Sequence, residues 1–195
     1  DGKGISKNQL PLAIKRFHTS KISKLDDLFT ISSLGFRGEA LASIASVAQL
    51  SIVSSEGSNE GAELSIVNGR LGELIPAANI NGTQVTIRDL FYNTPARRKF
   101  LKSPRTEGRK IIEMVRRFGL SRPNIGFSLI VDGKKVIDLF PEELKDRIGS
   151  LFDNTYKTNL IPIEISKADY TFTGFVGNLN IIRKRYGEQF LFMND

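Results

Sequence analysis

The sequence contains no cysteine and only one histidine, His18, among its 195 residues. The absence of cysteine excludes disulfide bonds, a thiolate nucleophile and a cysteine-bound metal ion. A lone histidine disfavours a Ser-His catalytic pair and a multi-histidine metal site, because both need further partners. The sequence therefore predicts no metal site within the chain.

Long apolar runs are also absent. No stretch reaches the roughly 18 consecutive apolar residues that a transmembrane helix requires, and no signal-peptide pattern opens the chain. Hydrophobic residues make up 40% of the sequence, which is enough for an ordinary globular core of one domain or slightly more. These features are typical of a cytosolic protein, and we expect no membrane contact.

Positive charge is concentrated in one segment. Residues 97–122 hold ten Lys or Arg and two Glu, a net charge of +8, whereas the whole chain carries +7, so the remainder is close to −1. A clustered basic segment is typical of a protein that binds a polyanion such as nucleic acid. The alternative is a solvated, charged helix face.

Hydrophobic periodicity predicts a mixed α/β chain. We expect helices at residues 7–18, 38–47, 105–119 and 142–151, and a long polar loop at 19–36. We expect strands at residues 49–54, 62–67, 71–75, 83–90, 127–131, 135–140, 159–165, 169–177 and 188–193. A helix start at Pro141-Glu142-Glu143 suggests a domain boundary, with residues 1–140 in one domain and 141–195 in a second.

The segment Leu34-Gly35-Phe36-Arg37-Gly38-Glu39-Ala40-Leu41 places two glycines in a loop that opens a helix. Glycines let backbone N–H groups approach an anion, and a helix N-terminus favours negative charge. Arg37 would add a charge-assisted contact. This pattern suits a phosphate, although it is not a P-loop. A plain helix cap after a loop is the alternative.

Two further segments have weaker signals. Thr19-Ser20-Lys21 offers two hydroxyls and an ammonium group, which suit a phosphate or a Mg²⁺-bound phosphate, and the alternative is an exposed loop. Gly82-Thr83 precedes an alternating strand. The glycine would let a flat ligand press against the backbone while the threonine hydroxyl bonds to it, and the alternative is a hairpin turn.

Taken together and in this order, these segments resemble the GHKL ATPases, and within them the MutL-type DNA mismatch repair proteins. The resemblance rests on Thr19-Ser20-Lys21-Ile22, on residues 34–41, and on Gly82-Thr83 continuing to Asp89-Leu90-Phe91-Tyr92-Asn93-Thr94-Pro95-Ala96-Arg97-Arg98-Lys99-Phe100. It extends over the whole chain and weakens after Phe140.

The resemblance implies a Bergerat fold that binds ATP beneath a mobile lid. By this analogy Gly2 and Gly4 form the glycine turn under the adenine, and Thr83 lies on the far wall. The lid and phosphate loop comprise Thr19, Ser20, Lys21, Gly35, Phe36, Arg37, Gly38, Glu39, Ala40 and Leu41. After Pro141 the chain resembles the start of the family's ribosomal-protein-like α/β sandwich, and residues 187–194 resemble its Gln-aromatic strand.

Several family elements have no matching position, so the resemblance predicts a chain truncated at both ends. The adenine-binding Asp would precede Asp1, and the Glu general base and the Mg²⁺-binding Asn would lie further upstream. A Lys that reaches the γ-phosphate would follow residue 195. No catalytic residue is therefore assigned in the chain. We expect negligible hydrolysis by these residues alone, and weak ATPase activity in the full-length protein.

The resemblance also implies a coordinator of mismatch repair that closes on ATP as a homodimer around DNA. Its expected partners are sequence-nonspecific DNA, a MutS-type mismatch recogniser, and an endonuclease and a helicase. The expected location is the bacterial cytosol, or the nucleus of a eukaryote. The candidate DNA contacts are Arg97, Arg98, Lys99, Arg109, Lys110, Arg116, Arg117, Arg183 and Arg185.

Two alternatives remain open. A topoisomerase-type GHKL subunit is disfavoured by residues Phe91 to Phe100, which match the MutL pattern instead. A non-hydrolysing nucleic-acid-binding module of the same fold would also suit a chain without a general base. The presence or absence of a Glu and an Asn one helical turn apart in the upstream sequence would separate the second alternative from an ATPase.

Overall fold

The computed structural model describes residues 2–31, 33, 35–57, 60–168, 170–182 and 187–193. The chain divides into two compact units, residues 1–101 and residues 102–195, and we describe each by itself. The division differs from the predicted boundary near residue 140. That boundary concerned which residues belong to each family domain, and it stays a prediction.

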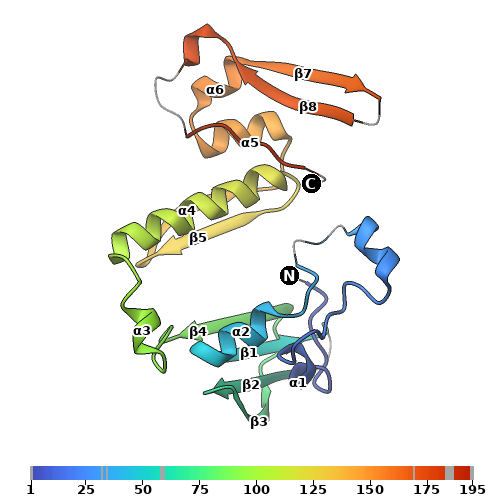
Figure 1. The fold of residues 1–195 in the computed structure, drawn as a ribbon, viewed down its shortest axis with the longest axis vertical. Coiled ribbons are helices and arrows are strands. Elements are labelled where there is room, and N and C mark those ends of the chain that lie inside the picture. Colours follow the sequence, from blue (N-terminus) through green and yellow to red (C-terminus); the bar gives the residue numbers. More distant parts are fainter. Residues whose placement is uncertain are drawn as a thin grey trace. The chain divides into compact units, whose positions relative to one another are not determined.

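Unit 1 is built on an antiparallel four-stranded sheet with the order β3-β2-β1-β4. The strands are β1 (Gln49–Ser55), β2 (Gly61–Val67), β3 (Arg70–Ala77) and β4 (Gly82–Arg88), and Figure 1 draws them in its lower part. The Asn68-Gly69 turn, with positive φ at both residues, joins β2 to β3 as a hairpin. All four strands agree closely with the sequence prediction.

One face of this sheet carries the core of unit 1. Leu50 and Ile52 of β1 lie opposite Ile66 and Leu64 of β2, and all four side chains are buried. Helix α2 (Ala40–Val47) contributes Ala45 to the same cluster. This burial follows from the period-2 alternation of the strands, because alternate side chains point to the same face.

The residues before α2 form less regular structure than predicted. The expected helix at residues 7–18 is only α1 (Leu10–Ala13), so that prediction was wrong in extent. Pro11 lies in the first turn of α1, and Phe17 adopts a positive φ of 64°, which a continuing helix does not permit. The predicted polar loop contains a 3₁₀ helix, η1 (Leu25–Thr30).

The segment after β4 is fixed to the C-terminal end of α2. Asp89 and Phe91 adopt positive φ values of 52° and 64°. The Phe91 N–H donates to the Val47 carbonyl at 2.7 Å, and the Asn93 side chain donates to the Ser46 carbonyl at 2.9 Å. These bonds satisfy carbonyls that a helix end leaves unpaired. Helix α3 (Pro95–Arg98) follows directly.

Unit 2 begins with the 18-residue helix α4 (Pro104–Ser121), whose first turn is capped by the Ser103 side chain accepting from the Thr106 N–H. The hairpin β5 (Phe127–Val131) and β6 (Lys134–Leu139) packs with it, followed by α5 (Leu144–Leu151) and α6 (Asn154–Thr158). Strands β7 (Leu160–Lys167) and β8 (Tyr170–Gly177) form a second hairpin, and η2 (Leu179–Ile181) ends the regular structure.

The core of unit 2 contains Leu120, Ile137, Leu139 and Leu151. Helix α4 faces it with Ile112 and Val115, whereas Ile111, Met114 and Phe118 are 53%, 52% and 37% exposed. The apolar side chains of α4 are therefore only partly directed at this core. The predicted strand at 188–193 is absent from described residues 187–193, which have no strand partner and place Phe190 against the core.

Arg147 of α5 is the largest fully buried side chain among the described residues. Its Nε donates to Glu142 at 2.9 Å, and its two terminal nitrogens donate to four backbone carbonyls. These carbonyls belong to Gly119, Pro123, Ile125 and Phe140. One guanidinium group thus joins α5 to the end of α4, the following loop and the end of β6.

Candidate functional site

The glycine turn at the start of unit 1 lies directly against the end of β1. Gly4 has a φ of +76°, and a Cβ atom there would lie 1.9 Å from the carbonyl oxygen of Ser55. No side chain other than that of glycine fits this approach. Gly2, by contrast, has no atom within 4 Å of an added Cβ atom. Of the two glycines in the predicted glycine turn, only Gly4 thus makes a close backbone approach.

A buried hydroxyl connects this turn to Thr83. The Ile5 N–H donates to the Ser54 Oγ at 2.8 Å, and the same oxygen lies 3.0 Å from the Gly82 carbonyl oxygen and 2.7 Å from the Thr83 Oγ1. Ser54 and Thr83 are direct partners in the register of β1 and β4. The residue directly after Gly4 and the predicted residue Thr83, which lie far apart in sequence, thus both bond to one serine.

Ser54 was not among the predicted site residues. The sequence does contain a signal for it, because Ser54 continues the alternation of Leu50 and Ile52 and therefore falls on the buried face of β1. Its side chain is only 1% exposed. A hydroxyl in a position of this kind needs hydrogen-bond partners to offset its burial.

The two predicted parts of the lid and phosphate loop also meet. Gly38 has a φ of +63°, and a Cβ atom there would lie 2.3 Å from the carbonyl oxygen of His18. The Phe17 N–H donates to the Gly38 carbonyl at 3.1 Å. Thr19-Ser20-Lys21 follows immediately, and the Thr19 Oγ1 accepts from the Lys21 N–H at 3.1 Å. Gly38 thus touches the backbone directly before Thr19.

The sequence predicts an anion site at the start of α2, and that assignment stays a prediction. The helix begins at Ala40, and no side chain caps its first turn. The first N–H groups of such a helix lack carbonyl partners within it and can donate to a bound anion. The Arg37 guanidinium lies 5.5 Å from the centre of the Phe36 ring. The Leu41 side chain packs on the core, so its contribution to a ligand would come from its backbone.

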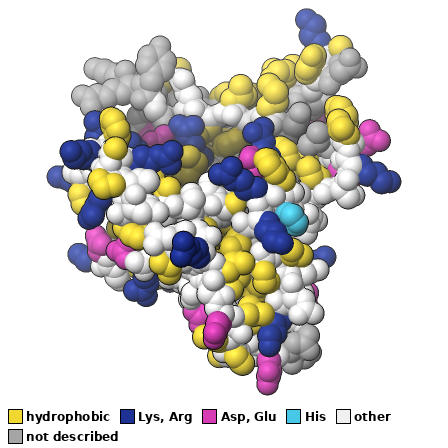
Figure 2. Space-filling view, turned by 60° about the horizontal axis from the view of Figure 1, so that its bottom comes forward, with side chains coloured by type: hydrophobic (Ala, Val, Ile, Leu, Met, Phe, Trp, Pro, Cys, Tyr) yellow, Lys and Arg dark blue, Asp and Glu magenta, His cyan; other side chains and the backbone are white. Residues whose placement is uncertain are grey.

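The other residues predicted for the lid and the phosphate loop differ in their exposure to solvent. Ser20, Lys21, Gly35 and Ala40 are exposed, while Thr19, Phe36 and Glu39 are half-buried. Leu34 lies outside the described residues. Further along the lid, N–H groups of Ser23 and Lys24, and then the Ser23 hydroxyl, donate to Asp27 and hold the pKa of that carboxyl below its ordinary value. His18, the one histidine, is exposed and is drawn in cyan in Figure 2.

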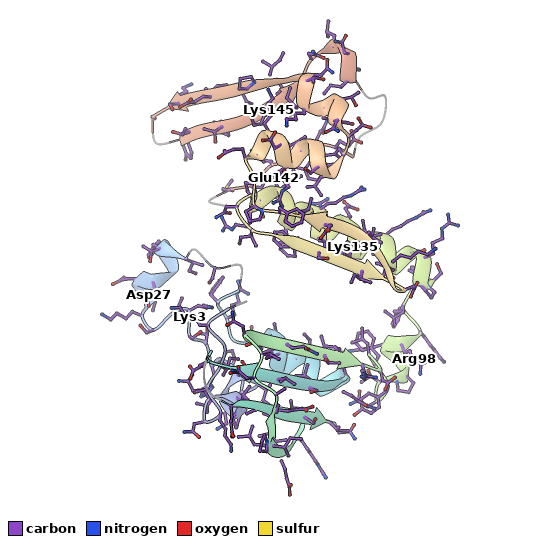
Figure 3. All side chains as sticks on the ribbon, turned by 180° about the vertical axis from the view of Figure 1, so that it is seen from behind. Lys3, Asp27, Arg98, Lys135, Glu142 and Lys145 are labelled. Carbon is purple, nitrogen blue, oxygen red and sulfur yellow. The ribbon has the colours of Figure 1, made fainter. Side chains whose placement is uncertain are left out.

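Some of the described candidate DNA-contacting side chains form ion pairs within the chain, and others do not. Within the described ranges, Arg97, Arg98, Lys99 and Arg109 are exposed and have no ion-pair partner. Figure 3 labels Arg98 on α3. Lys110 pairs with Glu107 at 3.2 Å, and Arg117 pairs with Glu113 at 2.8 Å.

Two of these arginines also lie over aromatic rings of unit 2. The Arg116 guanidinium lies 6.0 Å from the centre of the Phe152 ring, and that of Arg117 lies 5.9 Å from the Phe190 ring. Phe152 in turn contacts Tyr156 and Phe190, each with ring centres 5.7 Å apart. Arg116 and Arg117 therefore also contribute to the packing of unit 2. The predicted contacts Arg183 and Arg185 lie outside the described residues.

In the described part of the chain, no helix is long and apolar enough to cross a membrane. No group of three or more His, Asp or Glu side chains among the described residues is placed to hold a metal ion.

The arrangement in unit 1 is that of a GHKL-type ATP-binding fold. The chain superposes on the Aquifex aeolicus MutL ATPase domain in complex with ADP, with a TM-score of 0.67 at 28% identity over 84% of this chain and 57% of that one. A crystal structure of the N-terminal domain of a DNA repair protein gives a TM-score of 0.69 at 22% identity, which shows the fold alone. No protein-family model matches the sequence.

The sequence comparisons name the particular family. The chain is 42% identical to the DNA mismatch repair protein MutL of Porphyromonas gingivalis over 195 residues, and 38% identical to that of Geobacter sulfurreducens. MutL of Streptococcus pneumoniae is 41% identical over 196 residues. The whole chain aligns in each case, so it is MutL-type along its full length. It spans 32%, 32% and 30% of the length of these three relatives, respectively.

Proposed function

We propose that this chain contributes the glycine turn, the lid, the phosphate loop and one wall of the ATP site in a MutL-type mismatch repair protein. The contact of Ile5, the residue after Gly4, with Thr83 through Ser54 supports the adenine end of such a site. The contact of Gly38 with His18 and the uncapped start of α2 support the phosphate end. The related Aquifex aeolicus domain was solved in complex with ADP, which supports nucleotide binding by this fold.

A nucleotide phosphate suits the hydrogen-bond donors and cations in these segments. A phosphate group is an acceptor that suits the N–H groups at the start of α2, and Lys21 and Arg37 are exposed cations on the two adjoining segments. No Mg²⁺ ligand and no general base is assigned to the described residues. In this proposal the intact protein is a weak ATPase of the GHKL class, and these 195 residues alone bind nucleotide with negligible turnover.

Closure of the lid is the step that would connect ATP to the repair function. A ligand shifts a conformational equilibrium only by binding one state more tightly, and the γ-phosphate is the group that would distinguish the closed lid from the open one. In this proposal closure favours a homodimer that encloses DNA and links a MutS-type mismatch recogniser to an endonuclease and a helicase. A protein that repairs chromosomal DNA acts in the bacterial cytosol, or in the nucleus of a eukaryote.

Replacing Lys21 or Arg37 by alanine should weaken binding of a fluorescent, non-hydrolysable ATP analogue with Mg²⁺ by about tenfold, because each change removes a charge-assisted phosphate contact of about 1.5 kcal/mol. Titration of the chain and its variants measures this effect. Lys24→Ala is the matched control, since Lys24 is an exposed lysine of the same segment.

An equal loss of affinity in all three variants would contradict the assignment of Lys21 and Arg37 as phosphate contacts. Absence of ATP-analogue binding by the parent chain, with salt-sensitive DNA binding retained, would instead support the alternative of a non-hydrolysing nucleic-acid-binding module.

The DNA-binding proposal separates two arginines of α4. Arg109→Ala should reduce the slope of log K against log salt concentration by about 1, because one phosphate contact is lost. Arg117→Ala should reduce it less, since Arg117 is already paired with Glu113 and stacked on Phe190. Fluorescence anisotropy with duplexes of unrelated sequence over a salt series measures both slopes. If Arg117→Ala reduces the slope more than Arg109→Ala does, then Arg117 and not Arg109 contacts a DNA phosphate.

A further inference from the structure

The Ser54 hydroxyl has three polar partners but only one hydrogen to donate. The Ile5 N–H can only donate to it, and the Gly82 carbonyl can only accept from it. The third partner, the Thr83 hydroxyl, can do either. The direction of the 2.7 Å bond between the two hydroxyls is therefore set by the other two contacts.

One assignment satisfies all three contacts. Ser54 donates its hydrogen to the Gly82 carbonyl at 3.0 Å, and Thr83 donates its own hydrogen to Ser54. The opposite direction would place two acceptor oxygens, those of Ser54 and Gly82, 3.0 Å apart with no hydrogen between them. Because Ser54 is 1% exposed, water is excluded from that contact and would not relieve the repulsion.

This assignment fixes the hydrogen-bonding character of Thr83. Its hydroxyl hydrogen is directed at Ser54, so the oxygen can offer only its lone pairs to a ligand. Thr83 is exposed, and its hydroxyl oxygen is therefore accessible as an acceptor. An acceptor favours a base that presents an N–H donor, as the amino group of adenine does. It disfavours a base that presents a carbonyl oxygen at the same position, as guanine does.

We propose that Ser54 is a positioning residue that holds Thr83 as an acceptor and thereby favours adenine over guanine nucleotides. The inference rests on the proposed function, because it needs the nucleotide base to lie at Thr83. Through its bond from the Ile5 N–H, Ser54 also holds the residue that follows Gly4, so the same hydroxyl fixes both sides of the base.

The test compares affinities for non-hydrolysable ATP and GTP analogues, with Mg²⁺, in the intact protein. In Ser54→Ala the Thr83 hydroxyl is free to rotate and to donate, so the ratio of the GTP to the ATP dissociation constant should fall by about fivefold to tenfold. Thr83→Val should lower the ratio similarly, and the double variant should lower it little further. A merely structural role for Ser54 would weaken both nucleotides alike and leave the ratio unchanged.

Ser51→Ala provides the matched control. Ser51 lies on the other face of β1 and also loses one side-chain bond, which it donates to Glu63 at 2.7 Å. It should keep the parent ratio. If Ser54→Ala does not fold, Thr83→Val decides the question alone, because Thr83 is exposed and a parental ratio in that variant overturns the inference. A parent protein that binds neither analogue overturns the proposed function, and the inference with it.

Discussion

Replacing Arg147 by alanine should unfold unit 2, with a loss of about 3–5 kcal/mol in its free energy of unfolding. Arg147 is 0% exposed and is bonded to Glu142 and to four backbone carbonyls. Alanine would leave these carbonyls without their donor and would also create a cavity beside Gly119 and Leu151. Each unsatisfied buried acceptor costs about 1–3 kcal/mol, although water entry would offset part of the total.

Urea unfolding followed by hydrogen exchange measures this effect, since exchange separates the amides of residues 102–193 from those of unit 1. Lys145→Ala is the matched control, because Lys145 is an exposed cation on the same helix, labelled in Figure 3. It should change stability by less than about 0.5 kcal/mol. Arg147→Lys should recover only part of the loss, since one ammonium group does not reach all five acceptors. Equal effects of Arg147→Ala and Lys145→Ala would contradict this account.

The importance of Arg147 could not be predicted from the sequence. In the segment Leu144-Lys145-Asp146-Arg147-Ile148 it is one of several charged residues on a short amphipathic helix, where a solvated position is the usual expectation. Its burial depends on the end of α4, the loop after it and the end of β6 meeting at one point. Those contacts are non-local, and local periodicity contains no information about them.

The elements that local patterns determine were predicted well. Alternation predicted the four strands of unit 1 and both strands of the β5–β6 hairpin, but not the order of the strands in the sheet. The helix predicted at 7–18 was too long because apolar spacing does not show that the helix begins beside Pro11 and that Phe17 adopts a positive φ. The strand at 188–193 was wrong because an apolar alternating segment forms a strand only where a neighbouring strand supplies hydrogen bonds.

The sequence predicted the segments of the candidate site, but it did not predict the contacts between them. Residues 19–21, 34–41 and 82–83 were identified from their chemistry and their family pattern. Neither source shows that Gly38 touches the backbone of His18 or that Ser54 joins Ile5 to Thr83. Such contacts require the register of β1 and β4, which pairs Ser54 with Thr83 across the sheet.

Gly4→Ala should reduce affinity for the ATP analogue by about a hundredfold or more, which corresponds to about 2.7 kcal/mol. A left-handed conformation costs an alanine about 1–2 kcal/mol, and the new methyl group would also lie 1.9 Å from the Ser55 carbonyl oxygen. The clash involves backbone on both sides, so the glycine turn itself must move. Such a shift would displace Ile5 and break its bond to Ser54, which separates the turn from Thr83.

Gly57→Ala separates the two causes of this loss. Gly57 has a φ of +79°, close to that of Gly4, but no atom lies within 4 Å of an added Cβ atom. It should therefore show the conformational cost as a modest loss of stability and keep its affinity for the analogue. Calorimetric titration together with thermal unfolding of each variant measures both quantities. If Gly4→Ala binds as tightly as Gly57→Ala, the turn is not part of the nucleotide site. If Gly4→Ala loses affinity while unit 1 stays folded, the close approach of Gly4 to Ser55 serves the ligand and not the stability of the sheet.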